Sequence, residues 1–377
     1  MSRLEQLIQQ HCPNGVEYKK LGDVCDLVRG TRVVKKDLSA DGTYPVYQNS
    51  LKPLGYYDQY NRSEETTFII CAGAAGDIGY SKVKFWSADD CFSVICPETI
   101  SNRYIFYCLL SQQNRIYSQV RKASIPRLSH SAVEALHIPV PPLPVQEEIV
   151  RILDNFAELQ AELQAELQKR LQQYNYYRDK LLTFSDLNGG GYAVSVEWKK
   201  LGEICNLSRG KVYSKSYIEE NAGEYPVYSS QTANNGELGR ISTYDYDGEY
   251  LTWTTDGAYA GTIFYRKGKF SITNVCGLIS PKEDNLNIKF LFYWLSIKAP
   301  DYVYRGMGNP KLMSNQMEPI KVPIPPLAEQ QRIVDILDRF YTLTNDISEG
   351  LPAEIEARRK QYEYYRDQLL TFRECRM

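Results

Sequence analysis

The sequence predicts an α+β protein with two similar globular domains separated by two long antiparallel helices that form a coiled coil. Three observations predict this fold class. Most of the 377-residue chain repeats itself once, at an offset near 180 residues, which indicates a pseudo-twofold internal repeat. Short β-rich runs punctuated by Gly, Pro and Asp fill the first part of each copy. Apolar residues spaced alternately by four and three fill the rest, as in a coiled coil.

Four pairs of matching segments define the repeat. They are Glu17–Cys25 with Glu197–Cys205, Tyr44–Tyr47 with Tyr225–Tyr228, Ile138–Leu143 with Val322–Leu327, and Tyr174–Phe184 with Tyr362–Phe372. Their offsets grow only from 180 to 188 residues, so one unit has been duplicated. A solenoid repeat of roughly 20–50 residues is excluded. We therefore divide the chain into a first domain at 1–143, a spacer helix at 144–186, a second domain at 187–327 and a second helical region at 328–377.

The globular domains alternate short strands with short helices. The expected strands include Thr67–Cys71, Phe92–Cys96, Glu249–Thr254 and Thr262–Tyr265, and the expected helices are Arg103–Gln119 and Ile288–Ser296. Scaffold positions match between the two domains, whereas the loops share little. This pattern is typical of two related frames that carry two different sites.

The long helices each follow a Pro-Pro-Leu segment, a tolerated helix entry. The residues that we assign to the coiled-coil seam are Ile149, Leu153, Phe156, Leu163, Leu167, Tyr174, Ile333, Leu337, Phe340 and Tyr362. A first helix over 145–184 would be about 60 Å long at about 1.5 Å per residue. In the second helical region, the spacing changes at Gly350-Leu351-Pro352, which predicts a break there.

Three tandem copies of Ala-Glu-Leu-Gln occupy 157–168 within the first helix. All four residue types are compatible with a helix. One interpretation is a low-complexity helix with a solvated face. The other is a molecular spacer, in which each copy adds about 6 Å of length and about 40° of rotation.

Composition narrows the class of protein. The N-terminus lacks a signal-peptide core and no stretch has 18 uninterrupted apolar residues, so we expect a cytoplasmic protein with no membrane contact. Nine cysteines without a Cys-x-x-Cys pair are interpreted as reduced core residues, and three histidines are too few for a metal site. The net charge is −2, but residues 1–143 and 192–327 carry +2 and +1, which permits nucleic-acid binding without predicting it.

The duplicated motifs resemble the specificity subunit of type I restriction-modification enzymes over nearly the whole chain. The resemblance rests on Pro-Pro-Leu-x-x-Gln followed by Ile-Val-x-Ile-Leu-Asp at 141–154 and 325–338, on the duplicated Tyr-Tyr-Arg-Asp-x-Leu-Leu-Thr-Phe, and on the tetrapeptide array. It implies two target-recognition domains, each reading one half of a bipartite DNA site with unspecific base pairs between the halves. Because the family relates tetrapeptide copy number to spacer length, the resemblance favours a spacer role for 157–168.

The resemblance also implies recognition without catalysis. The sequence has no phosphate-binding Gly-x-x-x-x-Gly-Lys-Ser/Thr loop and no Asn/Asp-Pro-Pro-Tyr/Phe methylation motif. The implied partners are double-stranded DNA, modification (methyltransferase) subunits and, through the complex, restriction (translocase and nuclease) subunits. S-adenosylmethionine, ATP and Mg are expected in those subunits, and no cofactor or metal is expected in this chain.

A protein-binding scaffold stays compatible with the residues, whereas a self-contained methyltransferase is not expected. A coiled-coil scaffold would use its two domains to bind protein partners rather than DNA, and a self-contained methyltransferase would bind the methyl donor itself. Steep loss of duplex binding as salt rises would distinguish a DNA reader from a scaffold.

DNA recognition needs Arg or Lys for phosphates and guanine, and Asn or Gln for adenine. The expected DNA-binding residues of the first domain lie in three loops: Arg29, Arg32, Lys35, Lys36, Gln48, Asn49, Lys122, Ser124 and Arg127. Those of the second domain occupy matching places: Arg209, Lys211, Ser230, Gln231, Asn234, Asn235, Arg305, Asn309 and Lys311. Since the loop residues differ, we expect two different half-sites. The helix tyrosines fit either seam packing or a modification-subunit interface.

Overall fold

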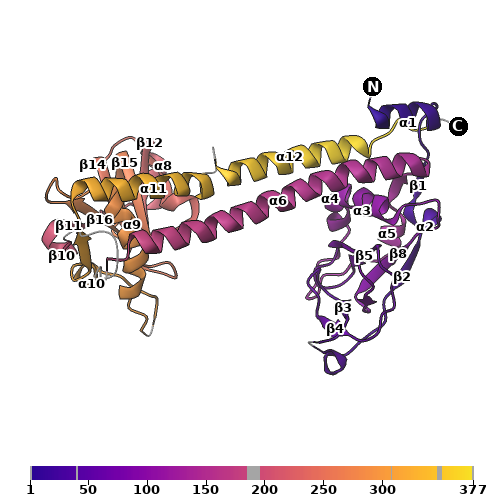
Figure 1. Ribbon diagram of the computed structural model, residues 1–377, viewed down its shortest axis with the longest axis horizontal. Helices are drawn as coiled ribbons and strands as arrows, with labels where there is room; N and C mark the ends of the chain where they lie inside the picture. The colour runs from indigo at the N-terminus through magenta and orange to yellow at the C-terminus, as the bar shows by residue number, and fades with distance from the viewer. Residues whose placement is uncertain (1, 40, 185–195, 307, 346–349, 376–377) are drawn as a thin grey trace. The chain divides into compact units, whose positions relative to one another are not determined.

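A computed structural model describes residues 2–39, 41–184, 196–306, 308–345 and 350–375 (Figure 1). The chain forms two compact units. The first unit contains Met1–Ala165 and Ala353–Met377, and the second contains Glu166–Pro352. Each unit therefore combines one globular domain with parts of the long helices. The expected divisions at residues 143, 186 and 327 stay predictions.

The first unit holds three small sheets. A two-stranded sheet pairs β1 (Tyr18–Lys20) with β9 (His137–Pro139). A four-stranded antiparallel sheet has the order β2 (Asp26–Arg29), β8 (Cys91–Ile95), β5 (Thr66–Ile70), β6 (Ile78–Ser81). A three-stranded sheet has the order β4 (Gly55–Tyr57), β3 (Tyr44–Tyr47), β7 (Trp86–Ser87). The short helices are α1 (Arg3–His11), α2 (Leu21–Val24), η1 (Lys35–Asp37), α3 (Asn102–Ser111), α4 (Gln113–Ser118) and α5 (His130–Glu134).

The second unit repeats this layout with a larger sheet. β10 (Glu197–Lys200) pairs with β17 (Lys321–Ile324), and six strands follow the order β11 (Cys205–Arg209), β16 (Cys276–Pro281), β14 (Tyr246–Thr254), β15 (Ile263–Ile272), β12 (Ala222–Tyr228), β13 (Glu237–Ile241). The short helices are α7 (Leu201–Ile204), α8 (Lys215–Glu220), η2 (Ala233–Gly236), α9 (Ile288–Lys298), η3 (Ala299–Tyr302) and α10 (Ser314–Met317).

Three long helices complete the chain: α6 (Leu143–Leu181), α11 (Leu327–Asn345) and α12 (Leu351–Leu369). Within the first unit α12 runs antiparallel to α6 (Figure 1), and the ring of Phe156 stacks on Tyr365 at 5.6 Å. Within the second unit α11 runs antiparallel to α6, and Tyr177 stacks on Phe340 at 5.6 Å. The expected α+β fold with antiparallel helices is confirmed in each unit.

The beginnings of the helices pack into their own domains. Ile149 and Leu153 are fully buried in the core of the first domain, and Ile333 and Leu337 are buried in the core of the second. These four residues continue the coiled-coil spacing because a domain core and a partner helix both select the same apolar stripe. Farther along α6, Leu163 is half-buried.

A repeated glutamine fastens each long helix to its domain. Gln146 is fully buried, and its amide donates to the carbonyls of Pro141 at 2.7 Å and Thr99 at 3.3 Å. Its carbonyl oxygen accepts the N–H of Ser101 at 2.9 Å. Gln330 makes the equivalent three bonds in the second unit. A buried amide with every partner satisfied fixes one geometry, which explains the glutamine of the repeated motif.

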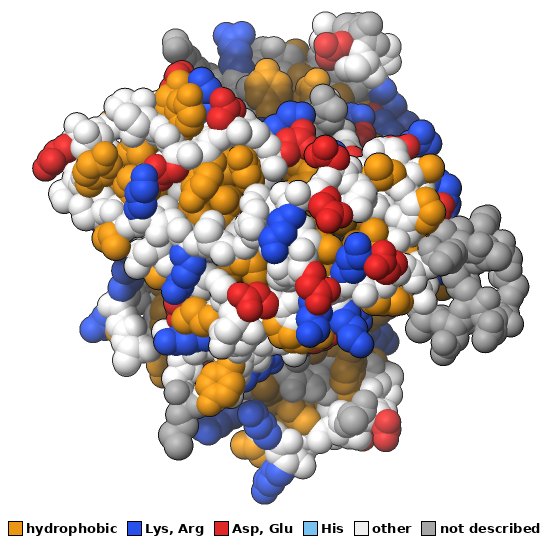
Figure 2. Space-filling view, turned by 90° about the vertical axis from the view of Figure 1, so that its left-hand side faces the viewer, with side chains coloured by type: hydrophobic (Ala, Val, Ile, Leu, Met, Phe, Trp, Pro, Cys, Tyr) orange, Lys and Arg blue, Asp and Glu red, His pale blue; other side chains and the backbone are white. Residues whose placement is uncertain are grey.

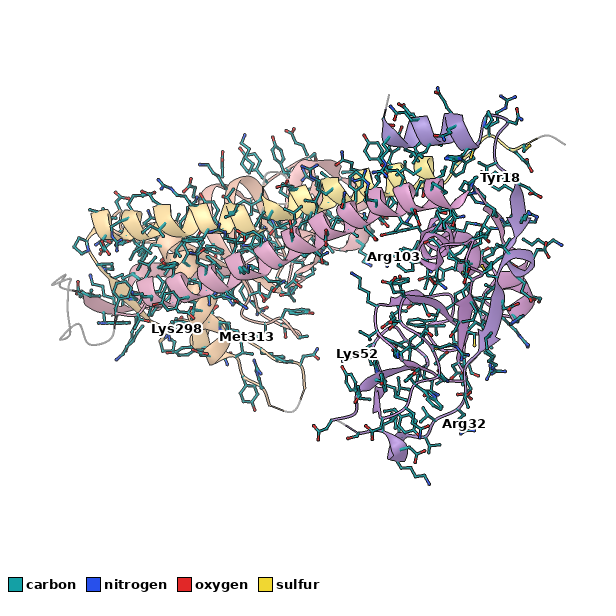
Figure 3. All side chains as sticks on the ribbon, turned by 45° about the vertical axis from the view of Figure 1, so that its right-hand side comes forward. Tyr18, Arg32, Lys52, Arg103, Lys298 and Met313 are labelled. Carbon is teal, nitrogen blue, oxygen red and sulfur yellow. The ribbon has the colours of Figure 1, made fainter. Side chains whose placement is uncertain are left out.

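The repeated aspartate supplies a second attachment. Asp154 of α6 lies 2.7 Å from Nη2 of Arg103 and accepts a hydrogen bond from the hydroxyl of Tyr107, both on α3. Arg103 lies beside α6 in Figure 3. In the second unit, Asp338 of α11 lies 2.5 Å from Nζ of Lys289 and accepts a hydrogen bond from the hydroxyl of Tyr293 at 2.6 Å, both on α9. Each domain is therefore held on its helix at two points, and this frame positions the loops.

One expected element differs. The helix expected over 103–119 is two helices, α3 and α4, because Gln112 leaves the helical conformation with φ −103° and ψ 14°. The strands and the helix expected elsewhere in the domains are present, with ends shifted by up to seven residues, since β15 continues from the expected Tyr265 to Ile272. The expected break near 350–352 coincides with the start of α12, and residues 346–349 lie outside the described residues.

Candidate DNA-recognition loops

The repeated Arg-Gly pair ends an edge strand in each domain. A Cβ on Gly30 would lie 2.0 Å from the carbonyl oxygen of Ala88, and a Cβ on Gly210 would lie 1.9 Å from that of Ile272. Only glycine permits this close approach of two backbones. The glycines therefore serve the frame, and the neighbouring arginines and following residues lie on exposed loops.

The first basic cluster is exposed, with Arg29 anchored. Its Nε donates to the carbonyl of Asp89 at 2.8 Å. Arg32, Lys35 and Lys36 are exposed and form no ion pair within the described residues. Figure 3 shows Arg32 at the end of the first domain remote from α6. These three cations are available for phosphates.

Three loops of the first domain meet beside the end of β5. Asn49 follows β3, and its carbonyl accepts the N–H of Ala74 at 2.9 Å. The N–H of Gly73 donates to the carbonyl of Pro126 at 3.2 Å, which joins the 121–127 loop to the same place. That loop is closed by backbone hydrogen bonds between Arg121 and Arg127 at 2.8 and 3.2 Å. The structure thus brings together three loops from separate parts of the sequence.

The side chains on these loops are largely free to meet a ligand. Asn49, Lys122, Ser124 and Arg127 are exposed. Gln48 is half-buried, and its amide donates to Asp90 at 3.4 Å. Within the described residues, neither Lys122 nor Arg127 forms an ion pair.

The second domain assembles the same three loops. Backbone bonds at 2.8 and 3.0 Å pair Tyr304 with Lys311 and close the 304–311 loop. The N–H of Leu312 donates to the carbonyl of Thr255 at 2.9 Å, and the N–H of Thr255 donates to the hydroxyl of Ser230 at 3.1 Å. The loops after β12 and β14 and the 304–311 loop therefore converge, as their counterparts do in the first domain. Arg305 and Asn309 are exposed on the third loop.

Several expected readers of the second domain already have partners. The hydroxyl of Ser230 donates to the carbonyl of Val275, and the amide of Gln231 donates to the carbonyl of Glu237. Arg209 donates to the hydroxyl of Thr255 at 3.0 Å. These side chains hold the loops in place as well as lying on them. Their assignment to DNA contact stays a prediction.

Two of the expected lysines are paired with acids. Lys311 lies 4.0 Å from Asp256. Lys211 lies 2.5 Å from Asp245, which also accepts the hydroxyl of Tyr213 at 2.6 Å. Burial alone would raise the pKa of Asp245, but the hydrogen bonds from Lys211 and Tyr213 outweigh it and lower that pKa. The charge of Lys211 is thus offset locally, although 72% of its side chain is exposed.

Asn234 and Asn235 lie on a left-handed turn. Their φ angles are 50° and 52°, and Gly236 follows at 78°. Both asparagines are exposed. Beneath them lies Arg266, a buried cation that sequence reasoning missed, because a strand arginine gives no signal of the distant residues that surround it.

The metal-ligating residue types in the described part of the chain do not form clusters. No cluster of three or more His, Cys, Asp or Glu there could hold a metal ion. All nine cysteines are free thiols, and seven of them are buried. No described helix is long and apolar enough to cross a membrane. On the face shown in Figure 2, Lys and Arg side chains are interspersed with Asp and Glu.

Comparisons with known proteins identify the frame. A family model for the type I restriction modification DNA specificity domain matches the chain twice, at residues 13–173 and 194–357. A Mycoplasma pneumoniae protein named as a type I specificity subunit is 46% identical over 61% of this chain and 91% of its own length. A Haemophilus influenzae protein named as a type I restriction enzyme specificity subunit is 32% identical over 98% of both chains.

A solved structure shares the fold. The type I restriction-modification S subunit from M. genitalium aligns with a TM-score of 0.66 and 18% identity, covering 94% of this chain and 96% of its own. The two family matches define a protein with two DNA specificity domains. The chain belongs to the family of type I restriction-modification specificity subunits. Its role is DNA sequence recognition without catalysis, which the comparisons support over the protein scaffold.

Proposed function

We propose that the chain reads a bipartite DNA site, with one half-site for each domain. The observation that carries this proposal is the convergence of the same three loops in both domains with different side chains on them. The first domain offers Arg127 with Asn49, and the second offers Arg305 with the Asn234–Asn235 turn. Equivalent frames with unlike loops would select unlike sequences, because side-chain identity at base edges sets the sequence that is read.

The boundaries proposed for the two readers are 1–143 and 187–327, with helical regions at 144–186 and 328–377. The repeats at 157–168 lie in the middle of α6, which is one uninterrupted helix of 39 residues. In this proposal, the repeats set the number of unspecific base pairs between the half-sites.

Exposed tyrosines on the helices form the proposed docking surface for modification subunits. In each repeated Tyr-Tyr-Arg-Asp motif, one tyrosine stacks on the opposing helix through Phe340 or Phe156. The tyrosine before it points outward, with Tyr176 61% and Tyr364 62% exposed. Exposed tyrosines are enriched at protein interfaces. The duplication offers the same surface twice, which suits two copies of one modification subunit.

The chemistry is assigned to the partners. S-adenosylmethionine would be bound by the modification subunits, and ATP and Mg by the restriction subunits that join through the complex. The modification and restriction subunits would act on DNA inside the cell, so we place the assembly in the cytoplasm. This chain would supply the choice of sequence.

Salt dependence of DNA binding tests the proposal. Affinity of the chain, with its modification subunits, for a duplex carrying the host site should fall with salt at a slope of about −0.9 per phosphate contact. A duplex with one half-site scrambled should bind more weakly at every salt concentration, since base contacts are lost while phosphate contacts remain. Equal affinity for intact and scrambled duplexes, or absence of duplex binding, would contradict the proposal.

A further inference from the structure

We propose that Arg266 is a positioning residue for DNA recognition by the second domain, because it fixes the left-handed turn that presents Asn234 and Asn235. The inference rests on the proposed function of these loops. It adds a specificity-determining residue that does not itself touch DNA.

Arg266 of β15 is a buried cation that forms no ion pair with a carboxylate of the described residues. Only 2% of its surface is exposed, and burial lowers its pKa. Its Nη1 has no hydrogen-bond partner within the described residues. The nearby carboxylate, Glu237, is instead paired with Arg240, whose Nε and Nη2 donate to the two carboxylate oxygens at 2.8 and 3.0 Å. Burying an unpaired charge lowers the stability of the fold, so we expect Arg266 to have a role that offsets this loss.

Arg266 lies over the ring of Phe264 at 4.5 Å, and three further contacts connect the sheet to the turn. Its guanidinium lies over the ring of Tyr228 at 3.6 Å, a cation–π contact. Nε donates to the hydroxyl of Thr252 at 3.2 Å, which ties the residue to β14. Nη2 donates to the carbonyl of Asn235 at 2.8 Å. Arg266 therefore supports the turn from beneath, at the backbone of its second residue.

The turn needs such support because its conformation is unfavourable. Two successive non-glycine residues, Asn234 and Asn235, have φ near +50°, a region that L-residues seldom occupy. Such conformations persist only where surrounding contacts hold them. The base of the loop is closed by the N–H of Ser229, which donates to the carbonyl of Gly236 at 2.9 Å. Within the turn, the N–H of Glu237 donates to the carbonyl of Asn234, and Arg266 supplies the side-chain contact, to the carbonyl of Asn235.

The matching position of the first domain is not an arginine. The segment 78–91 matches 263–276 at an offset of 185, which places Ser81 opposite Arg266. Ser81 donates its hydroxyl to the nearby carbonyl of Val83 at 2.6 Å. The arginine therefore belongs to the part that differs between the two domains, as expected of a residue that shapes one half-site.

The test uses the full chain assembled with its modification subunits, and measures methylation of duplexes with single base-pair changes in either half-site. Arg266→Met removes the donors and keeps the volume, and we expect the preference for the intact half-site to fall about tenfold or more in one half-site only. The half-site preference of the Arg266→Lys variant should lie between that of Arg266→Met and that of the parent chain. Lys267→Met, on the same strand but with 71% of its side chain exposed, is the control and should keep both preferences.

Variants of Asn235 distinguish the effect of the turn's backbone conformation from that of the asparagine side chain. They also test the inference if Arg266→Met does not fold. Asn235→Val disfavours positive φ and should reduce the same half-site preference, while Asn235→Gly keeps the turn and should lose less. A folded Arg266→Met protein with both preferences intact would overturn the inference. Equal losses in both half-sites, or an equal loss for the Gly and Val variants, would overturn it as well. Failure of the proposed function would instead appear in the wild-type chain, as preference for neither half-site.

Discussion

Deleting one tetrapeptide, Ala161–Gln164, should shorten the unspecific spacer and leave both half-site sequences unchanged. The deletion removes four of the 39 residues of α6. At about 1.5 Å and about 100° per residue, the helix loses about 6 Å and turns by about 40°. At about 3.4 Å per nucleotide along a strand, this length corresponds to about two base pairs.

The structure predicts that the deletion leaves the first domain intact. Ala157, Gln160, Ala161 and Gln164 line a cleft of about 480 Å³ between α6 and the first domain. After the deletion, the next repeat places Ala and Gln at the same positions 161 and 164. Leucines recur every four residues from Leu159 to Leu171, so the apolar spacing is retained too. We therefore expect thermal stability close to that of the parent chain.

The assay maps methylated bases in host DNA from cells that carry the parent or the shortened chain. The predicted result is the same two half-sites with a spacer shorter by one or two base pairs. Insertion of a fourth repeat is the matched control and should lengthen the spacer. An unchanged spacer in both variants would refute the reasoning.

Three further predictions follow from the loops and helices. Arg127→Ala and Arg305→Ala should each weaken duplex binding by about 1–3 kcal/mol if the side chain reads a base, or lower the salt slope by about one if it meets a phosphate. Tyr176→Ala combined with Tyr364→Ala should weaken assembly with modification subunits in a pull-down titration, because both lost rings are exposed. Asp245→Asn should reduce the acid dependence of unfolding: the lowered pKa stabilises the fold above the ordinary Asp value near 3.8, and this stability is lost as pH falls through the lower folded pKa.

Each of these predictions has a result that would contradict it, and the tyrosine prediction also has a matched control. Leu159→Ala changes another exposed apolar residue of α6 and should leave assembly intact. Normal assembly of the double tyrosine variant would remove the docking surface. Unchanged duplex binding in both arginine variants would remove the loop assignment. A parallel acid-unfolding curve for Asp245→Asn would show that its ion pair adds no pH-dependent stability.

Most of the fold could be predicted from the sequence repeat, because the positions that match between the two copies are structural positions. Gln146 and Asp154 recur in the second copy, and the structure shows that each makes the same attachment twice. The apolar stripe at Ile149 and Leu153 predicted a helix correctly, yet it could not separate packing in a domain core from packing between helices. Both uses bury the same stripe.

The site was harder to predict because loop polarity has two uses. Ser230 and Gln231 fit a DNA reader by residue type, but their side chains make hydrogen bonds within the domain. The role of Arg266 could not be predicted from the sequence, because its partners Tyr228, Thr252 and Asn235 come from separate parts of the chain. Such contacts depend on strand order in the sheet, which sequence spacing does not determine.

The central claim is that two equivalent frames with unlike loops read two unlike half-sites. Mapping the methylated bases in host DNA from cells that produce the parent chain with its modification subunits tests this claim most directly. The account predicts one motif made of two different half-sites, separated by base pairs of any sequence. An uninterrupted motif, or two identical half-sites, would contradict it.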